Sequence, residues 1–337
     1  MAGLTDKTIT FFRDETVFSI SLILPIISCF FIRPNQGYIS YINWNTIILL
    51  FIIMVIVEIL KNLAVFEVLV KKLLKKTANT RGLVAALVFS CFISSIFITN
   101  DVSLIMFVPF AVMALKKVQR ADLIVITVCL QTIAANVGCM ILPIGAPHNI
   151  VMYTQSNISF GSFFMILLPY ILVSVAFLSV ILCFIPKDDI VIHGMLEVQV
   201  DRKNFIKRVF RGVDYYLLLT FIALFILIGN LENVTFLSEI FKKWIIGNEV
   251  LCGIVASQII SNVPAAMLLS GFSTNYEAII VGINIGGFGT LIASMANLIS
   301  YNVIVRQCNE LKGRYLMIFT VLNVMLLLVL LGVNMIG

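Results

Sequence analysis

The sequence predicts an all-α polytopic membrane protein built from an inverted repeat, with one extra span at its N-terminal end. The chain is 61% hydrophobic and only 12% charged, whereas soluble domains are about 45–50% apolar and about a quarter charged. Two glycine-interrupted apolar segments, residues 136–149 and 284–297, both begin Asn-x-Gly and both end in Asn. Basic residues cluster in the loops between apolar segments, which is the positive-inside pattern.

We predict four parts along the chain. They are an N-terminal span with an external loop (residues 1–43), a first repeat (44–186), a cytoplasmic linker (187–213) and a second repeat (214–337). The apolar segment 16–32 follows a charged start and precedes no small-residue cleavage site, so we expect a retained anchor rather than a signal peptide. The N-terminus is then expected in the cytoplasm and the C-terminus outside.

The first repeat is expected to contain five elements. A span is followed by an amphipathic interfacial helix whose lysines face anionic headgroups, then by a hairpin, a broken helix and a second span. These elements occupy residues 44–59, 61–76, 82–115, 121–153 and 161–185.

The hairpin is predicted from the charges that flank it. Residues 82–115 are apolar apart from Thr99-Asn100-Asp101, and Arg81 precedes them while Lys116 and Arg120 follow. A re-entrant hairpin places both basic flanks in the cytoplasm, whereas a single crossing would leave one outside. The alternative is two full crossings, with the polar triplet in an external turn.

The second repeat has the same order with the opposite orientation. Its hairpin is interrupted at Ser261-Asn262-Val263-Pro264, and its flanks are not basic. The span, interfacial helix, hairpin, broken helix and final span are expected at residues 214–230, 235–245, 250–272, 277–301 and 315–336. Paired interruptions in corresponding halves are the best sequence pointer to a transporter's binding site.

The tips and breaks supply the candidate site residues. The candidate substrate ligands are Thr99, Asn100, Asp101, Asn136, His148, Asn149, Ser261, Asn262, Thr290 and Asn297. Backbone carbonyls and side chains that would hold a coupling ion belong to Asn100, Gly138, Gly145, Asn262, Asn284, Gly286 and Gly289.

Four of these residues have competing interpretations. Asp101 is the only acidic residue well inside an apolar stretch, which makes it functional by default, although it can also cap the helix after the tip. His148 can relay protons or serve as a neutral, hydrogen-bonded histidine. For Asn100 and Asn262 the alternative to ligand binding is capping of the tip.

Several classes of function find no support. The seven cysteines are scattered without a Cys-x-x-Cys pair, which gives no sign of a disulfide framework or a metal site. No catalytic cluster and no nucleotide-binding motif is present, so we expect no enzyme, no cofactor and no nucleic-acid partner. An ATP-driven pump would need a separate ATPase subunit.

The tips and breaks resemble those of the ion-transporter superfamily. Its members include arsenical efflux pumps, citrate-transporter-like permeases, sodium–dicarboxylate symporters and one branch of sodium/proton antiporters. The resemblance runs from about residue 44 onwards and is carried by residues 99–101, 136–149, 261–264 and 284–297. It implies that tips and breaks line a shared substrate and cation site, and that a transport domain moves against a fixed scaffold like an elevator.

The chain also departs from parts of that superfamily. Dicarboxylate symporters carry Ser-Asn-Thr at both tips, but here the tips read Thr-Asn-Asp and Ser-Asn-Val. Antiporter relatives often have a polar residue where Ala146 stands and Pro or Gln where His148 stands. We therefore expect an ion-coupled secondary transporter of a small anion, which is an arsenite-like oxyanion, an inorganic anion or a carboxylate.

Na⁺ or H⁺ would drive this transport. The alternative is a Na⁺/H⁺ antiporter that uses Asp101 as the exchanged carboxylate. The expected partners are the small anion and the lipid bilayer of the cell membrane, and a homodimer is compatible with the sequence.

Overall fold

The structure is a computed structural model that describes residues 25–29, 32, 37–63, 77, 79–190 and 204–336. Within these ranges the secondary structure is helical apart from one isolated β-bridge, which confirms the all-α class. Six helical segments are long and apolar enough to cross a membrane: α4 (Trp44–Asn62), α6 (Thr80–Phe97), η1 with α8 (Ala121–Gly138), α10 (Phe160–Cys183), α11 with α12 (Phe205–Asn233) and η3 with α18 (Asn309–Met335). A bent pair, residues 238–245 and Glu249–Ile260, is a seventh candidate.

Two predicted elements lie largely outside the described residues. One is the N-terminal span at residues 16–32, of which residues 25–29 and 32 are described. The other is the interfacial helix at residues 61–76, of which residues 61–63 are described.

The described helices of residues 37–190 are compatible with the order expected for the first repeat, which stays a prediction. A short helix, α3 (Tyr38–Tyr41), precedes α4. After α6 the chain continues through α7 (Asn100–Lys117), η1 (Ala121–Leu123), α8 (Ile124–Gly138), η2 (Pro143–Gly145), α9 (Pro147–Gln155) and α10. The hairpin is thus α6 and α7, and the broken helix is α8 and α9.

The second repeat follows the same order. Its elements are α12 (Tyr215–Asn233), α13 (Thr235–Ile245), α14 (Glu249–Ile260), α15 (Asn262–Phe272), α16 (Tyr276–Gly286), α17 (Met295–Gln307), η3 (Asn309–Leu311) and α18 (Lys312–Ile336). Here α14 and α15 form the hairpin, and α16 and α17 form the broken helix.

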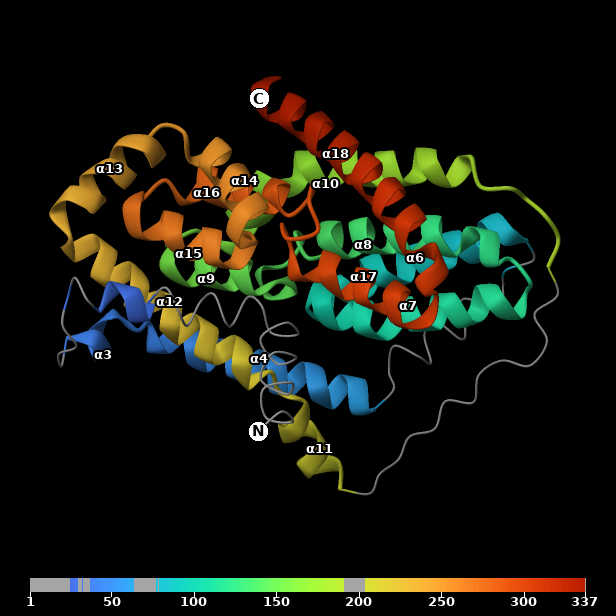
Figure 1. Cartoon of the computed structure of the whole chain (residues 1–337), viewed down its shortest axis with the longest axis horizontal. Helices are drawn as coiled ribbons and strands as arrows, with labels where there is room; N and C mark the ends of the chain where they lie inside the picture. Colours follow the sequence, from blue (N-terminus) through green and yellow to red (C-terminus); the bar gives the residue numbers. More distant parts are fainter. Residues whose placement is uncertain are drawn as a thin grey trace, which may run out of the picture.

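The two halves exchange the second arms of their broken helices. In the first half α6 and α7 pack on α8, and in the second half α14 and α15 pack on α16. The second arm of each break crosses over, because α17 packs on α7 and α9 packs on α15. In Figure 1, α6, α7, α8 and α17 gather toward one end of the molecule, and α9, α14, α15 and α16 toward the other. The inverted repeat and its orientation in the membrane stay predictions.

The centre of the molecule is α8. Nearly all of its side chains are buried, and its last residue, Gly138, lies against α6. A Cβ on Gly138 would stand 2.3 Å from the carbonyl oxygen of Phe92. Glycine is therefore required at this contact between the hairpin and the broken helix.

One predicted loop contains a helix. The linker was expected to be irregular, but residues Phe205–Gly212 form α11, which packs on α4. Ile206, Val209 and Phe210 recur at helical spacing and Val209 is buried, while basic residues occupy the positions between them. The prediction was wrong because a short amphipathic segment rich in charge carries too weak an apolar signal by itself.

Candidate substrate and ion site

The breaks of the two halves meet through two asparagine pairs. The Nδ2 of Asn136 donates to the Oδ1 of Asn297 at 3.0 Å, and the Nδ2 of Asn284 donates to the Oδ1 of Asn149 at 2.8 Å. Each pair joins the first asparagine of one break to the last asparagine of the other. We call them the crossed asparagine pairs, and all four residues are buried.

The last asparagine of each break also donates to backbone carbonyls within its own break, and the acceptors include equivalent positions of the two halves. Asn149 donates its Nδ2 to the carbonyl of Cys139 at 3.1 Å, and Asn297 donates to the carbonyls of Gly287 and Thr290, both at 3.0 Å. Backbone carbonyls freed by a broken helix need partners when they are buried. The asparagine amides supply those partners.

The first hairpin tip joins this network directly. The Nδ2 of Asn100 donates to the Oδ1 of Asn136 at 2.9 Å, and its Oδ1 accepts from the backbone N–H of Asp101 at 3.0 Å. Asn100 and Thr99 are buried beside the break. The first tip therefore contacts the central break, and the re-entrant interpretation of the hairpin stays a prediction.

The second tip contacts the network through its backbone. The N–H of Asn262 donates to the carbonyl of Ala293 at 3.0 Å. The side chain of Asn262 is buried, and it makes no hydrogen bond to any other part of the chain that the structure describes. Ser261 forms the turn itself with φ 73° and ψ 155°, a backbone conformation that residues other than glycine seldom adopt.

Asp101 does not cap its helix. Its Oδ1 is buried and has no hydrogen-bond partner among the described residues, and no side chain caps α7 at Thr99. The capping interpretation is therefore wrong, and the carboxylate faces a cavity instead.

The cavity lies between the first helix of each half and the second arms of the breaks. It has a volume of about 730 Å³ and is lined along α4 from Leu50 to Lys61 and along α17 from Met295 to Arg306. Thr99, Asp101 and Pro147 line it as well. The N-terminal ends of α7, α9 and α17 thus all line the cavity, as does the exposed Arg306 near the C-terminal end of α17.

Most of the other charge in the cavity wall is already engaged. The Nζ of Lys61 lies 2.9 Å from the Oε1 of Glu58. The Oδ1 of Asp214 accepts from the N–H of Leu217 at 2.9 Å, as the cap of α12. Asp101 is the acidic group of this wall that has a buried oxygen without a partner.

His148 lies beside the crossed pairs rather than on the cavity wall. It is buried, and its Nε2 lies 3.3 Å from the Oδ1 of Asn284. This is a hydrogen-bonded histidine, and the contact is compatible with both interpretations of His148. In the second half the corresponding position is Ala296, so the contact exists in one half only.

Sequence reasoning missed Gln258. Its Nε2 donates to the carbonyls of Gly286 at 2.8 Å and Phe288 at 2.9 Å, while its Oε1 accepts from the N–H of Thr290 at 2.8 Å. The signal that could have identified Gln258 is its polar amide side chain, which lies within the otherwise apolar helix α14 one turn before the tip. Gly286, expected to offer its carbonyl to a coupling ion, offers it to Gln258.

The remaining candidate glycines shape the loops. The carbonyl of Gly138 accepts from the N–H of Ile141 at 3.2 Å. A Cβ on Gly145 would lie 2.6 Å from the Cα of Cys139, and Gly289 has φ 110°. Each glycine therefore permits a close approach or a turn that a side chain would block.

With this geometry established, the family model described as citrate transporter matches residues 8–275. The chain belongs to the citrate transporter family. It is 30% identical to an uncharacterized transporter of Methanocaldococcus jannaschii, over 93% of this chain and 94% of that protein. It is 28% identical to the inner membrane protein YbiR of Escherichia coli, over 86% of this chain and 87% of that protein.

A third similar protein matches over a shorter stretch. A protein of Dictyostelium discoideum that carries the name arsB is 29% identical over 45% of this chain and 26% of its own length. The family and the apolar helices together establish a multi-pass membrane transporter of the anion permease type. The expected superfamily is thereby confirmed.

Proposed function

We propose that the protein is an ion-coupled secondary active transporter of a small anion, which works by alternating access across the cell membrane. The observation that carries this proposal is that the N-terminal ends of three helices, α7, α9 and α17, line one cavity. Helix N-termini present free N–H groups and the positive end of the helix dipole, so they favour an anion.

The asparagines of the two tips do not line the cavity themselves, but they could supply further donors. Asn262 has a buried side-chain amide that is not engaged in the described structure, and an amide can donate to an oxyanion or a carboxylate. Asn100 is held at a fixed position by Asn136. A carboxylate such as citrate or an oxyanion is the substrate class that we propose, which agrees with the names of the family and of the arsB protein.

The orientation that we propose follows from the basic residues. The side chain of Lys116 donates to the carbonyl of Gln307 at 3.1 Å, so the end of α7 and the end of α17 lie side by side. Arg81 and Arg120 both contact residues that follow α10. These basic groups share one end of the molecule, and the positive-inside rule assigns that end to the cytoplasm. The N-terminus would then be inside and the C-terminus outside.

Asp101 carries the coupling ion in this proposal. A carboxylate with an unpartnered buried oxygen needs a proton or a cation to be stable, and both are available through the cavity. The same observation favours a second candidate function, a Na⁺/H⁺ antiporter in which Asp101 exchanges the two cations and no anion moves.

The test is flux in inverted membrane vesicles. Arsenite, phosphate, sulfate, citrate and succinate are each offered under a Na⁺ gradient and, separately, under a pH gradient. We expect flux of one anion, and we expect Asn262→Ala to remove it. The control Asn323→Ala replaces a buried asparagine in α18, away from the tips, and should retain it. Cation-dependent pH change without anion flux would support the antiporter instead.

A further inference from the structure

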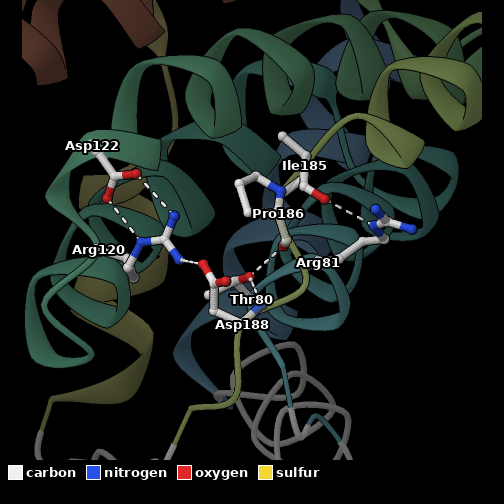
Figure 2. Close-up of polar contacts among 7 residues, drawn as sticks. All are labelled: Thr80, Arg81, Arg120, Asp122, Ile185, Pro186 and Asp188. Carbon is white, nitrogen blue, oxygen red and sulfur yellow. Dashed lines mark hydrogen bonds and ion pairs between the residues drawn. The ribbon is translucent and has the colours of Figure 1, made fainter.

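The chain doubles back after α10 and crosses the ends of two other helices. We call residues 185–189 the strap. Figure 2 shows that it lies between the start of α6, which carries Thr80 and Arg81, and the turn before α8, which carries Arg120 and Asp122. The strap is the first part of the linker between the two repeats.

Backbone contacts attach the strap to the start of α6. The N–H of Thr80 donates to the carbonyl of Asp188 at 2.9 Å, and the N–H of Asp188 donates to the Oγ1 of Thr80 at 3.1 Å. The same hydroxyl donates to the carbonyl of Pro186. An antiparallel bridge joins Asn79 to Asp189. Because Thr80 is fully buried, water does not compete for these bonds.

Side chains attach the strap on both sides (Figure 2). The Nε of Arg81 donates to the carbonyl of Ile185 at 2.9 Å. The guanidinium of Arg120 binds both oxygens of Asp122, at 3.0 and 2.9 Å, and also an oxygen of Asp188. A planar guanidinium suits this bridging role between two carboxylates.

The far end of the linker is attached to a different helix. There α11 packs on α4, and its last residue, Gly212, lies so close to Glu58 that an added Cβ would stand 2.2 Å from the carboxylate. The linker therefore begins on the body that contains α6, α8 and the first hairpin, and it ends on α4.

We propose that the strap stays fixed to α6 and to the turn before α8 throughout the transport cycle, with Thr80 and Arg120 as its positioning residues. The inference rests on the proposed function only in assuming that a transport cycle exists. A strap that is released in part of the cycle is the competing arrangement.

The bridge between Asn79 and Asp189 provides the test. Directly opposed residues on antiparallel backbones have Cα atoms about 4.5–5.5 Å apart, a separation that a disulfide accepts. The exposed Cys183 and the half-buried Cys29 and Cys252 are first replaced by serine. Asn79→Cys with Asp189→Cys is then made in this background. Each single cysteine variant is the matched control, because it carries the same loss of a side chain.

We expect oxidation to cross-link the pair fully and citrate flux in vesicles to remain within twofold of the reduced protein. Flux that falls more than tenfold on oxidation and returns on reduction would overturn the proposal, because the strap would then have to open. Spin labels on the two cysteines give a readout without transport. One short distance with and without citrate and Na⁺ supports a fixed strap, and a second, longer distance contradicts it.

Arg120 is tested separately as a positioning residue. We expect Arg120→Gln to lower the maximal citrate flux about three- to tenfold at unchanged KM, and to broaden the spin-label distance. Arg120→Lys should restore part of the flux. An unchanged distance in Arg120→Gln would remove Arg120 from the proposal. Absence of citrate flux in the unmodified protein would count against the proposed function with citrate, while the distances still decide the strap.

Discussion

The two hairpins have the same place in their halves but differ at their tips. The first tip is relaxed, because Ile98 and Thr99 are both extended with negative φ, and it carries the carboxylate of Asp101. The second tip is a strained turn, since Ser261 has φ 73°, and it is neutral because Val263 stands where the first tip has Asp101.

The bases of the two hairpins, which are the ends of their arms opposite the tips, differ as well. The first base is attached to the strap by an exposed ionic contact and by Thr80. The second base closes on itself, because the hydroxyl of Ser273 donates to the buried carboxylate of Glu249 at 2.8 Å, and the N–H of Gly247 donates to the same carboxylate at 3.1 Å. The two halves therefore share the crossed asparagine pairs. They differ at their tips, because the first tip carries a charged side chain and the second carries backbone strain.

This comparison suggests that the two halves have different roles in transport. The crossed asparagine pairs are common to both halves and position the helix ends that would receive an anion. Asp101 has no counterpart, so ion coupling would belong to the first half alone. The strained turn at Ser261 would make the second tip the one that changes conformation more easily, since strain persists only where the surroundings impose it.

The largest expected effect comes from breaking the crossed asparagine pairs. Asn297→Ala removes the acceptor of Asn136 and leaves the buried carbonyl of Gly287 and the partly buried carbonyl of Thr290 without their donor. Because unsatisfied buried groups are costly, we expect the free energy of unfolding to fall by about 2–4 kcal/mol, and flux to disappear.

Thermal unfolding in detergent measures this loss. The control is Asn323→Ala, which removes one hydrogen bond of an amide whose Oδ1 already lacks a partner in the described structure. It should cost about 0.5–1 kcal/mol. Equal losses of unfolding free energy in the two variants would show that the crossed asparagine pairs stabilise the fold no more than another buried asparagine does.

A smaller effect is expected at the contact between α6 and α8. Gly138→Ala would place a Cβ against the backbone of Phe92, and overpacking of this kind costs about 1–3 kcal/mol. Gly313→Ala in α18 is the control, because nothing lies within 4 Å of its Cβ position. A melting temperature equal to that of the unmodified protein in Gly138→Ala would contradict the close approach.

The smallest effect distinguishes the tips. Ser261→Gly should raise the free energy of unfolding by up to about 1 kcal/mol, since glycine relieves the backbone strain but loses more entropy on folding. Thr99→Gly, at the relaxed tip, has no strain to relieve and should lower it by about 0.5–1 kcal/mol. If both variants shift the melting temperature in the same direction, the tips do not differ in strain.

The fold could be predicted wherever the signal is local. Glycine, proline and asparagine interrupt apolar runs at residues 136–149, 261–264 and 284–297, and the structure turns at each of them. The amphipathic helix at Thr235–Ile245 was predicted with its observed bounds. By contrast, α11 was missed because a short basic segment gains its helix from packing on α4, which no local pattern encodes.

The asparagines of the two breaks were named from the sequence, but their pairing was not predicted. The four asparagines were candidates, yet their crossed partners lie in opposite halves of the chain, and only the exchange of α9 and α17 brings them together. Gln258 was missed for the same reason, because its acceptors belong to α16 and the loop after it. The positive φ of Ser261 could not be foreseen, since serine carries no preference for it.

The most direct test of the account is Asp101→Asn, reconstituted into proteoliposomes with the anion that the flux panel identifies. Gradient-driven accumulation and anion exchange at equilibrium are measured on the same preparation. The account predicts that accumulation is lost while exchange continues, because the crossed asparagine pairs and the helix N-termini still receive the anion. Unchanged accumulation would contradict the account, since coupling would then not depend on Asp101.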